Sequence, residues 1–473
     1  LADINNSSAC LDFVRECRNR GIRPLCGIDF RKGDQWMYTC IACNNDGFSE
    51  INGFLSSCNL NQTDIPLTAP AFSHAYVVYP ARHRVDALRE NEFIGVNDQD
   101  IPRVCLNFTE KNRAKYVAFH PVSFAGPDDF ELHRHLEAIG HNTILGMLRE
   151  GQTASRNEVF VIPEELKKKY ASYPDLISNA ERLQESCSFD FDFSTPKNKR
   201  TFTGSVYEDR LLLEKVALEG MEYRYGKANK EAEKRIRHEL EVIGNLGFLP
   251  YFLIVWDMLR YTLSHGINHV GRGSGGNSIV AYCLRITDID PVELDLYFER
   301  FINPARTSPP DFDIDFSWKD RDKVHQYLFK RYGAQHIALL GATTTFQKNS
   351  IIRELGKVYG LPKNDIDALE QNPNSALQQN EISEKIFHYG ERLLDFPLHR
   401  SIHAGGVLIS ELPLSYYTAL DLPPKGFATT QWDMYVAESI GFAKFDILSQ
   451  RGLGHIKDCV DLVERNRGIK IDI

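Results

Sequence analysis

Three aspartates alternate with apolar residues at positions 311–316, which read Asp-Phe-Asp-Ile-Asp-Phe. Side chains of a β-strand point alternately to its two faces, so this run predicts a strand with one apolar face and one acidic face. Carboxylates one strand step apart repel each other, and a bound divalent cation would relieve that repulsion. A solvent-facing edge strand produces the same pattern, so the run by itself leaves both interpretations open.

A glycine-rich segment at 271–278, upstream of the acidic run, reads Gly-Arg-Gly-Ser-Gly-Gly-Asn-Ser. A turn followed by a helix-like run at 279–284 predicts an anion site, because free backbone N–H groups at a helix start face a phosphate. The segment is neither a Walker A loop nor the dinucleotide-binding glycine pattern, and a tight turn is the ordinary alternative. A phosphate cradle followed by an Asp-x-Asp strand is more specific, since together they offer a triphosphate site and carboxylates for two Mg²⁺ ions.

A third carboxylate candidate lies in residues 444–448, which read Lys-Phe-Asp-Ile-Leu. The segment predicts a short apolar strand that carries Asp446, with Lys444 two residues earlier on the same face. The lysine would neutralise a phosphate beside the metals. A strand-end carboxylate without a metal is the alternative, and this segment alone favours it.

These residues closely resemble the palm of the C-family DNA polymerases, the family of the bacterial replicative DNA polymerase III alpha subunit. The resemblance covers essentially the whole chain and is densest over 271–361. The segments that carry it are 271–274, 286–291, 298–304, 310–316, 352–358, 402–407 and 444–446.

The resemblance implies template-directed DNA synthesis, in which a primer 3′-OH attacks a dNTP with two Mg²⁺ ions as cofactors. The implied metal-binding catalytic acids are Asp311, Asp313 and Asp446. The implied contacts to the incoming nucleotide come from Arg272, Gly273, Ser274 and Lys444. Asp315 shares the acidic face but is not one of the family's three essential acids, so its expected role is support. The implied partners are primer–template DNA and, within the replicase, the sliding clamp, the clamp loader and a proofreading exonuclease subunit.

The resemblance also implies the fold, an α/β multidomain chain. A degenerate α/β barrel of the polymerase-and-histidinol-phosphatase (PHP) type is expected over 1–180. A nucleotidyltransferase-like palm is expected over 181–342 and 401–456, with a helical thumb inserted at 343–400. Residues 457–473 would begin the fingers.

The N-terminal region departs from the PHP pattern at its metal ligands. The first His-x-His pair is absent, Ile4 stands where the barrel carries a histidine, and Asp29 stands where it commonly carries a glutamate. We therefore interpret the region as scaffolding, with a metal-dependent phosphoesterase as the alternative function. The chain begins with Leu1 rather than Met, and by the resemblance only the start of the fingers is expected in it. A fragment truncated at both ends is expected, and a catalytically incomplete assembly piece is a third hypothesis.

Hydrophobic periodicity predicts short alternating elements in the N-terminal region. The expected helices are 10–20 and 48–55, and the expected strands are 24–30, 36–42, 76–79 and 116–120, with a polar break at 97–103. Further along, 208–246 is interpreted as a surface helix pair with i,i+4 ion pairs. Residues 250–263 predict a buried apolar helix.

The net charge is −9, from 55 Lys+Arg and 64 Asp+Glu. This argues against a general nucleic-acid coat, but a local groove needs only clustered cations. Residues 319–357 hold eight Lys/Arg against three Asp/Glu. A solvated helix face is the ordinary explanation. Next to a nucleotide site, the cluster favours DNA-backbone contacts from Lys348, Arg353 and Lys357.

The ten cysteines show no framework spacing, and the single Cys-x-x-Cys at 40–43 has no second pair that would complete a zinc site. They predict reduced core thiols and a cytoplasmic location. No run of about twenty apolar residues occurs, which argues against a membrane span.

Overall fold

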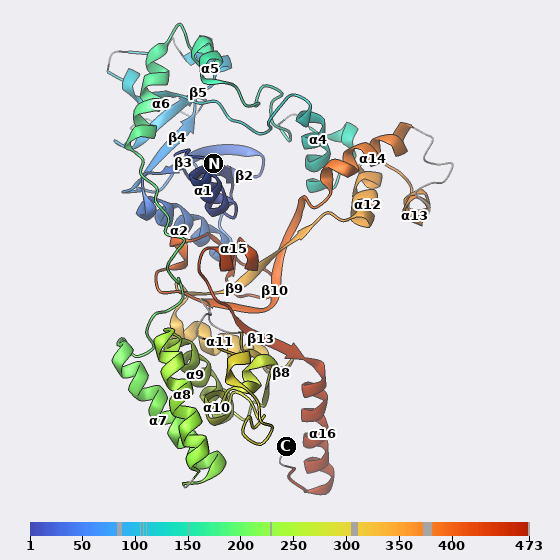
Figure 1. Ribbon diagram of the computed structural model, residues 1–473. Helices are drawn as coiled ribbons and strands as arrows, with labels where there is room; N and C mark the ends of the chain where they lie inside the picture. The colour runs from blue at the N-terminus through green and yellow to red at the C-terminus, as the bar shows by residue number, and fades with distance from the viewer. Residues whose placement is uncertain are drawn as a thin grey trace. The chain divides into compact units, whose positions relative to one another are not determined.

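The computed structural model describes residues 1–82, 88–104, 106, 108–109, 111–149, 151–227, 229–303, 311–371 and 381–471. The chain, drawn in Figure 1, forms two compact units. The first unit consists of Leu1–Phe191 and Thr343–Ser401, and the second of Asp192–Ala342 and Ile402–Ile473. Each unit is therefore built from two separate stretches of chain. The domain names expected from the sequence stay predictions.

A six-stranded mixed sheet forms the centre of the first unit. Its strands lie in chain order: β1 (Ala2–Ile4), β2 (Gly27–Lys32), β3 (Gln35–Ala42), β4 (Ala75–Pro80), β5 (Glu92–Val96) and β6 (Tyr116–Ala118). β1 and β2 are parallel, as are β4, β5 and β6, whereas β3 is antiparallel to both of its neighbours. Among the described residues no pairing joins β1 to β6. The expected α/β character is confirmed, and closure into a barrel is not.

Helices cover this sheet through apolar residues at helical spacing. In α1 (Cys10–Asn19), for example, Cys10, Leu11, Val14 and Cys17 are buried. The other helical segments before residue 191 are α2 (Asn45–Asn61), η1 (Asp98–Asp100), α3 (Ile101–Val104), η3 (Arg113–Lys115), α4 (Asp129–Gly140), η4 (Leu145–Met147), α5 (Pro163–Lys169) and α6 (Pro174–Ser186).

The second stretch of the first unit supplies three helices: α12 (Lys348–Val358), α13 (Lys363–Gln371) and α14 (Glu381–Leu393). One apolar stripe of α12 is buried, formed by Ile351, Ile352, Leu355 and Val358. The first three of these residues share a hydrophobic cluster with Leu132 of α4. Residues 343–401 therefore complete a core that begins in the N-terminal stretch.

The second unit contains a seven-stranded sheet in the order β11-β12-β9-β10-β13-β8-β7. The strands are β7 (His269–Arg272), β8 (Asp313–Ser317), β9 (Ile337–Thr345), β10 (Pro397–Ile409), β11 (Leu420–Asp421), β12 (Thr429–Thr430) and β13 (Phe445–Gln450). β8 and β13 are parallel, β7 is antiparallel to β8, and β10 is antiparallel to β13. β9 and β10 both extend into residues that belong to the first unit.

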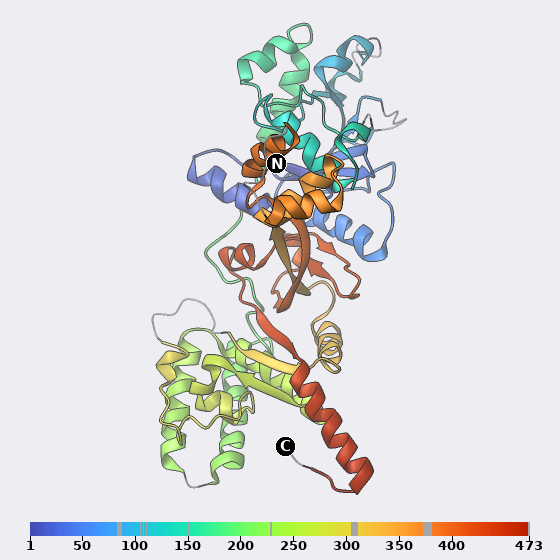
Figure 2. The ribbon, with the colours of Figure 1, turned by 90° about the vertical axis from the view of Figure 1, so that its right-hand side faces the viewer.

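Four helices of the second unit pack on one another (Figure 1): α7 (Val206–Tyr225), α8 (Lys230–Asn245), α9 (Leu249–Ser264) and α10 (Ile279–Cys283). Their apolar side chains share one core with those of β8 and β13. The predicted apolar helix at 250–263 is confirmed as α9, which is buried over most of its length. α16 (Arg451–Arg467) leaves the end of β13 and extends away from α7 and α8 (Figure 2). The remaining helical segments are η5 (Gly273–Asn277), η6 (Phe298–Arg300), α11 (Arg321–Tyr332), η8 (Leu414–Tyr416) and α15 (Met434–Ser439).

The predicted helix pair at 208–246 is confirmed as α7 and α8, each with one exposed and one buried face. Ion pairs do line the outside, such as Arg237 with Glu233 at 2.8 Å. α8, however, buries Ala232, Ile236, Glu239 and Ile243, and α7 also buries one side. The buried spacing of four, three and four residues is that of a helix face packed on a core.

Several local predictions can be compared directly with the structure. The helix at 10–20 and the strands at 36–42 and 76–79 are confirmed, whereas the polar break at 97–103 is largely helical. Pro304, Pro310 and residues 372–379 lie outside the described residues.

The nine described cysteines form no disulfide; seven are buried, and Cys459 is exposed. No single helix in the described ranges is long and apolar enough to cross a membrane. The pair α8 and α9, which is bent by 116°, reaches the length and apolar composition of a span only when the two helices are taken together.

Candidate active site

Two neighbouring strands place the predicted acids on one face of the second unit's sheet. β8 and β13 are parallel, and Asp313 pairs in register with Asp446. Side chains of residues paired in register point to the same face, so these two carboxylates lie beside each other. Asp311 stands two residues before Asp313, at the entry to β8. The apolar residues between and after the acids are buried, as the alternation predicts: Phe312, Ile314 and Phe316.

Lys444 bridges two of the acids. Its ammonium contacts Asp446 Oδ2 and lies 3.7 Å from Asp311 Oδ1. Burial alone would lower the pKa of this ammonium, but the hydrogen bond to Asp446 and the carboxylates of Asp311 and Asp313 outweigh burial and raise it. Lys444 therefore stays protonated on the acidic face. It lies on the same side of the strand as Asp446, as predicted.

Arg272 bridges the next two acids. It ends β7, opposite Asp313, and its Nε lies 2.9 Å from Asp315 Oδ2 while Nη1 lies 3.4 Å from Asp313 Oδ2. Burial raises the pKa of the Asp313 carboxyl; Arg272 opposes this rise, and the carboxylates of Asp446 and Asp311 add to it. The structure thus brings together acids and cations from three distant segments of the chain.

The acidic face has the donor chemistry that Mg²⁺ prefers, since carboxylate oxygens are its usual protein ligands. Asp446 Oδ1 and Asp315 Oδ1 are buried without a hydrogen-bond partner among the described residues. A buried oxygen without a hydrogen-bond partner lowers the stability of the fold unless a cation or a water molecule binds to it. No three His, Cys, Asp or Glu side chains in the described ranges already converge as a metal site. Instead, Lys444 forms an ion pair with Asp446, and Arg272 forms one with Asp315. The residues therefore fit Mg²⁺ by donor type and by their orphaned oxygens.

The glycine-rich segment joins β7 to α10 as predicted, by a turn followed by a helix. η5 follows Arg272, and Ser278 caps α10 by accepting a hydrogen bond from Ala281 N at 3.0 Å. Gly273 has a φ of +77°, which glycine adopts without strain. A Cβ added there would lie 3.3 Å from Asp313 Oδ2, so the loop starts immediately beside the acids. Ser274 follows and is exposed, and its contact with a phosphate stays a prediction.

Tyr251 of α9 is a site residue that sequence reasoning missed. Its hydroxyl accepts a hydrogen bond from Phe312 N at 3.2 Å and donates one to the Lys444 carbonyl at 3.4 Å. Its ring stacks on Phe312 and Phe445, with centroid distances of 5.5 and 4.7 Å. One side chain thereby ties together the entries of β8 and β13. The available signal was a hydroxyl in an apolar run, where burial demands a partner.

The three predicted DNA-contacting cations all lie on α12, in the first unit. Arg353 pairs with Glu370 at 3.0 Å, and Lys357 with Glu354 at 2.7 Å. Lys348 makes no ion pair with any residue that the structure describes. Residues 319–342 of the predicted cationic cluster belong to the second unit. Contact of these side chains with DNA stays a prediction.

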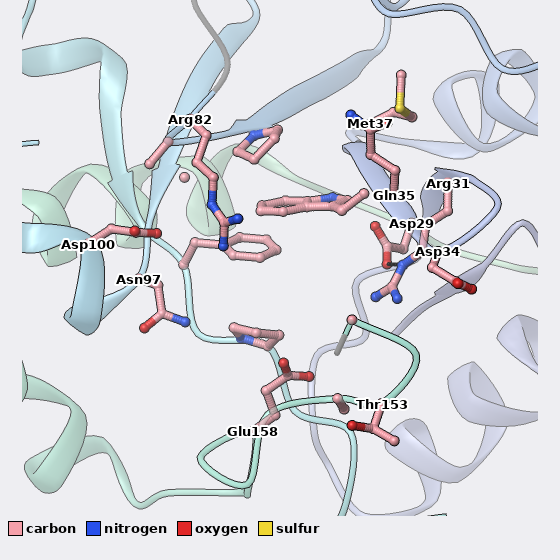
Figure 3. Close-up of a pocket in the computed structure, with 18 of the residues that line it drawn as sticks. Asp29, Arg31, Asp34, Gln35, Met37, Arg82, Asn97, Asp100, Thr153 and Glu158 are labelled. Carbon is pink, nitrogen blue, oxygen red and sulfur yellow. Dashed lines mark hydrogen bonds and ion pairs between the residues drawn. The ribbon is translucent and has the colours of Figure 1, made fainter. Parts of the chain in front are cut away.

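The first unit contains a cavity of about 510 Å³ next to the ends of its strands (Figure 3). The guanidinium groups of Arg31 and Arg82 point into it, and Trp36 and Phe119 stack in its wall at 4.6 Å. Burial raises the pKa of the Asp29 carboxyl in the same cavity, although Arg31 lies 2.8 Å away and opposes this rise. The phosphoesterase hypothesis for this unit stays a prediction, and the described residues offer it no cluster of metal ligands.

The family model of the bacterial DNA polymerase III alpha NTPase domain matches residues 211–449, just over half of the chain. An error-prone DNA polymerase of Symbiobacterium thermophilum is 29% identical over 97% of this chain and 49% of its own length. The DNA polymerase III subunits alpha of Bacillus subtilis and Borreliella burgdorferi are 27% and 33% identical, over 100% and 98% of this chain and 47% and 46% of their own lengths. The chain thus spans about half the length of the curated relatives it matches. On the match to the family model, the chain belongs to the bacterial DNA polymerase III alpha family.

Proposed function

We propose that this chain carries the nucleotidyl-transfer site of a DNA-directed DNA polymerase that acts in DNA replication. The observation that carries the proposal is the register of β8 and β13, in which Asp313 stands beside Asp446. The loop of Gly273 borders the same carboxylate, and family membership supports the same activity. The substrates are primer–template DNA and a deoxynucleoside triphosphate.

Three carboxylates hold two Mg²⁺ ions in this proposal: Asp311, Asp313 and Asp446. When bound, Mg²⁺ would supply positive charge for activation of the primer 3′-OH and for stabilisation of the pyrophosphate leaving group. The protein contributes by fixing where that charge lies, because β-sheet pairing and Tyr251 hold the two acidic strands together. Asp315 supports the site by keeping Arg272 beside it.

Lys444 and Arg272 bind the triphosphate in this proposal. Both cations neutralise acids in the structure, and their charge is needed there only while no other cation is bound. They then turn to the phosphate oxygens, which accept charge-assisted hydrogen bonds well. Gly273 and Ser274 offer the same phosphates backbone N–H groups and a hydroxyl.

Primer–template DNA is proposed to contact the cations of α12. Lys348 is the strongest candidate of the three, because it makes no ion pair with a described residue, whereas Arg353 and Lys357 already do. Partnership with a sliding clamp, a clamp loader and a proofreading exonuclease subunit is proposed from family membership alone.

Charge-removing variants test this site. Asp313→Asn and Asp446→Asn keep the side-chain shape and remove the charge, so we expect folding to persist while Mn²⁺ binding is lost and nucleotide incorporation falls by roughly 100-fold or more. Asp461→Asn is the control, because Asp461 is exposed on α16. Mn²⁺ binding is measured on residues 1–473, and incorporation on the longest natural polypeptide that contains them. Unimpaired metal binding and incorporation in both site variants would refute the proposal.

A further inference from the structure

Glu239 is a buried carboxylate of α8 that the proposed chemistry does not use. Its side chain is 1% exposed, and its two oxygens accept three hydrogen bonds. Oε2 accepts from the Ser278 hydroxyl at 2.7 Å and from Val280 N at 3.1 Å, and Oε1 accepts from Ile279 N at 3.0 Å. All three donors stand at the start of α10, immediately after the glycine loop Gly273–Asn277.

Burial of this carboxylate costs free energy, and its three hydrogen-bond donors all lie at the start of α10. A carboxylate removed from water costs several kcal/mol unless hydrogen bonds compensate it. Burial raises the pKa of Glu239 to about 7, while the bonds from Ser278, Val280 and Ile279 oppose that rise. A helix start leaves its first N–H groups without intrahelical partners, and here a neighbouring helix supplies the acceptors. The cost is therefore concentrated at the base of the glycine loop.

The loop has two further anchors. Its N-terminal end follows Arg272, which pairs across strands with Asp313. Its middle packs on the acidic strand, because a Cβ added to Gly275 would lie 3.1 Å from the Phe312 ring. The C-terminal end runs into α10, which has five residues and is too short to hold its own shape without tertiary support. Glu239 supplies such support at this end.

We propose that Glu239 is a positioning residue for nucleotide binding: its carboxylate fixes the C-terminal end of the loop Gly273–Asn277, so that the loop's backbone N–H groups stay aimed at the incoming phosphates. The inference rests on the proposed nucleotidyl-transfer function. Glu239 contacts neither nucleotide nor metal in this role. A carboxylate is required because two acceptor oxygens serve three donors, whereas glutamine offers one oxygen and an amide that cannot accept.

Binding of dATP to residues 1–473 in Mg²⁺, measured by isothermal titration calorimetry, tests the proposal. We expect Glu239→Ala to raise the Kd for dATP about tenfold, the worth of one charge-assisted hydrogen bond, and Glu239→Gln to raise it less. Glu241→Ala is the matched control, because Glu241 is exposed on the same helix, and its Kd should equal that of the wild type.

Hydrogen exchange gives a second measurement that does not depend on nucleotide. In Glu239→Ala, exchange should rise at the amides of Ile279 and Val280, while exchange in α9 stays unchanged. An unchanged Kd in folded Glu239→Ala, unchanged exchange at these amides, or a rise throughout α9 would each overturn the proposal; the last would indicate a general packing role.

Two outcomes need a separate decision. If Glu239→Ala does not fold, Glu239→Gln, which keeps the side-chain size, decides by the same two measurements. If the wild type binds no dATP in Mg²⁺, the proposed function fails, and hydrogen exchange alone then decides whether Glu239 anchors the loop.

Discussion

Gly273 combines a backbone requirement with an electrostatic one. Its φ of +77° favours glycine, and a Cβ would lie 3.3 Å from Asp313 Oδ2. Gly266 has a similar φ of +62° but nothing within 4 Å of an added Cβ, so it is a matched control. We expect Gly273→Ala and Gly266→Ala each to lower the free energy of unfolding by about 1 kcal/mol in chemical denaturation. Mn²⁺ binding should weaken only in Gly273→Ala. Equal Mn²⁺ affinities in the two variants would contradict the loop's place beside the acids.

Glu239 should make stability depend on pH. Its pKa is raised from 4.5 to about 7 in the folded protein, chiefly by burial. Below pH 4.5 the carboxyl is protonated in both states, so its contribution is fully present. As pH rises toward 7, the unfolded state ionises first, and stability relative to Glu239→Gln should fall by about 3 kcal/mol in total. Urea denaturation of both proteins between pH 4.5 and 8 checks this. A pH-independent difference would show that the folded pKa is not raised.

The candidate site was partly predictable at the scale of single residues. Asp311, Asp313 and Arg272 stand in local patterns, a strand alternation and a glycine turn, that sequence displays directly. Asp446 does not, because its own segment favours an ordinary strand-end acid. What gives it a partner is the pairing of β13 with β8, a contact between segments far apart in the chain. Glu239 could not be singled out in the sequence, because α8 carries many charged residues.

At the scale of elements, α9 is fastened to the two acidic strands by Tyr251. We expect Tyr251→Phe to keep the ring stacking and lose both hydroxyl hydrogen bonds, lowering the free energy of unfolding by about 1–2 kcal/mol and weakening Mn²⁺ binding. Tyr261→Phe is the control, because Tyr261 lies on the same helix and stacks on Tyr327 at 4.0 Å. Thermal denaturation and Mn²⁺ titration compare the two. Equal effects would mean that the bridge between β8 and β13 does not position the acids.

Helix α12 gives an electrostatic prediction. If Lys348 contacts a DNA phosphate, the logarithm of the DNA association constant should fall less steeply with the logarithm of salt concentration in Lys348→Gln. The magnitude of this slope should decrease by about one. Lys385→Gln on α14 is the control, because Lys385 is already paired with Glu381. Fluorescence anisotropy with a primer–template at several salt concentrations measures both slopes. Identical slopes for the two variants would remove Lys348 from the DNA interface.

Elements with a strong internal pattern could be predicted, and those defined by partners could not. α1, α9 and β8 show their periodicity in sequence, and each is present in the structure. β10 was not predicted, because much of its first half is exposed and only its last five residues form a buried run. α8 was predicted as a helix, but its buried face was not, because its surface charges are conspicuous and its buried positions are few and include an acid.

At the scale of the whole molecule, the chain matches about half the length of its curated relatives. We expect residues 1–473 alone to bind primer–template weakly and to add few or no nucleotides, because polymerisation requires surfaces that close over the substrate and exclude water. Primer extension with Mg²⁺ and all four dNTPs measures this. Sustained synthesis by these residues would show that the matched half is sufficient for turnover.

The division of each unit into two stretches of chain sets an order of events during synthesis. A ribosome completes residues 1–191 first, but Phe346, Ile351 and Leu355, which pack against Leu132 of α4, emerge only after Ala342. Until then Leu132 lacks these packing partners. The N-terminal stretch therefore stays incompletely folded while residues 192–342 of the second unit are translated. A translation pause placed between residues 192 and 342 would prolong that incompletely folded state and raise the demand for chaperones.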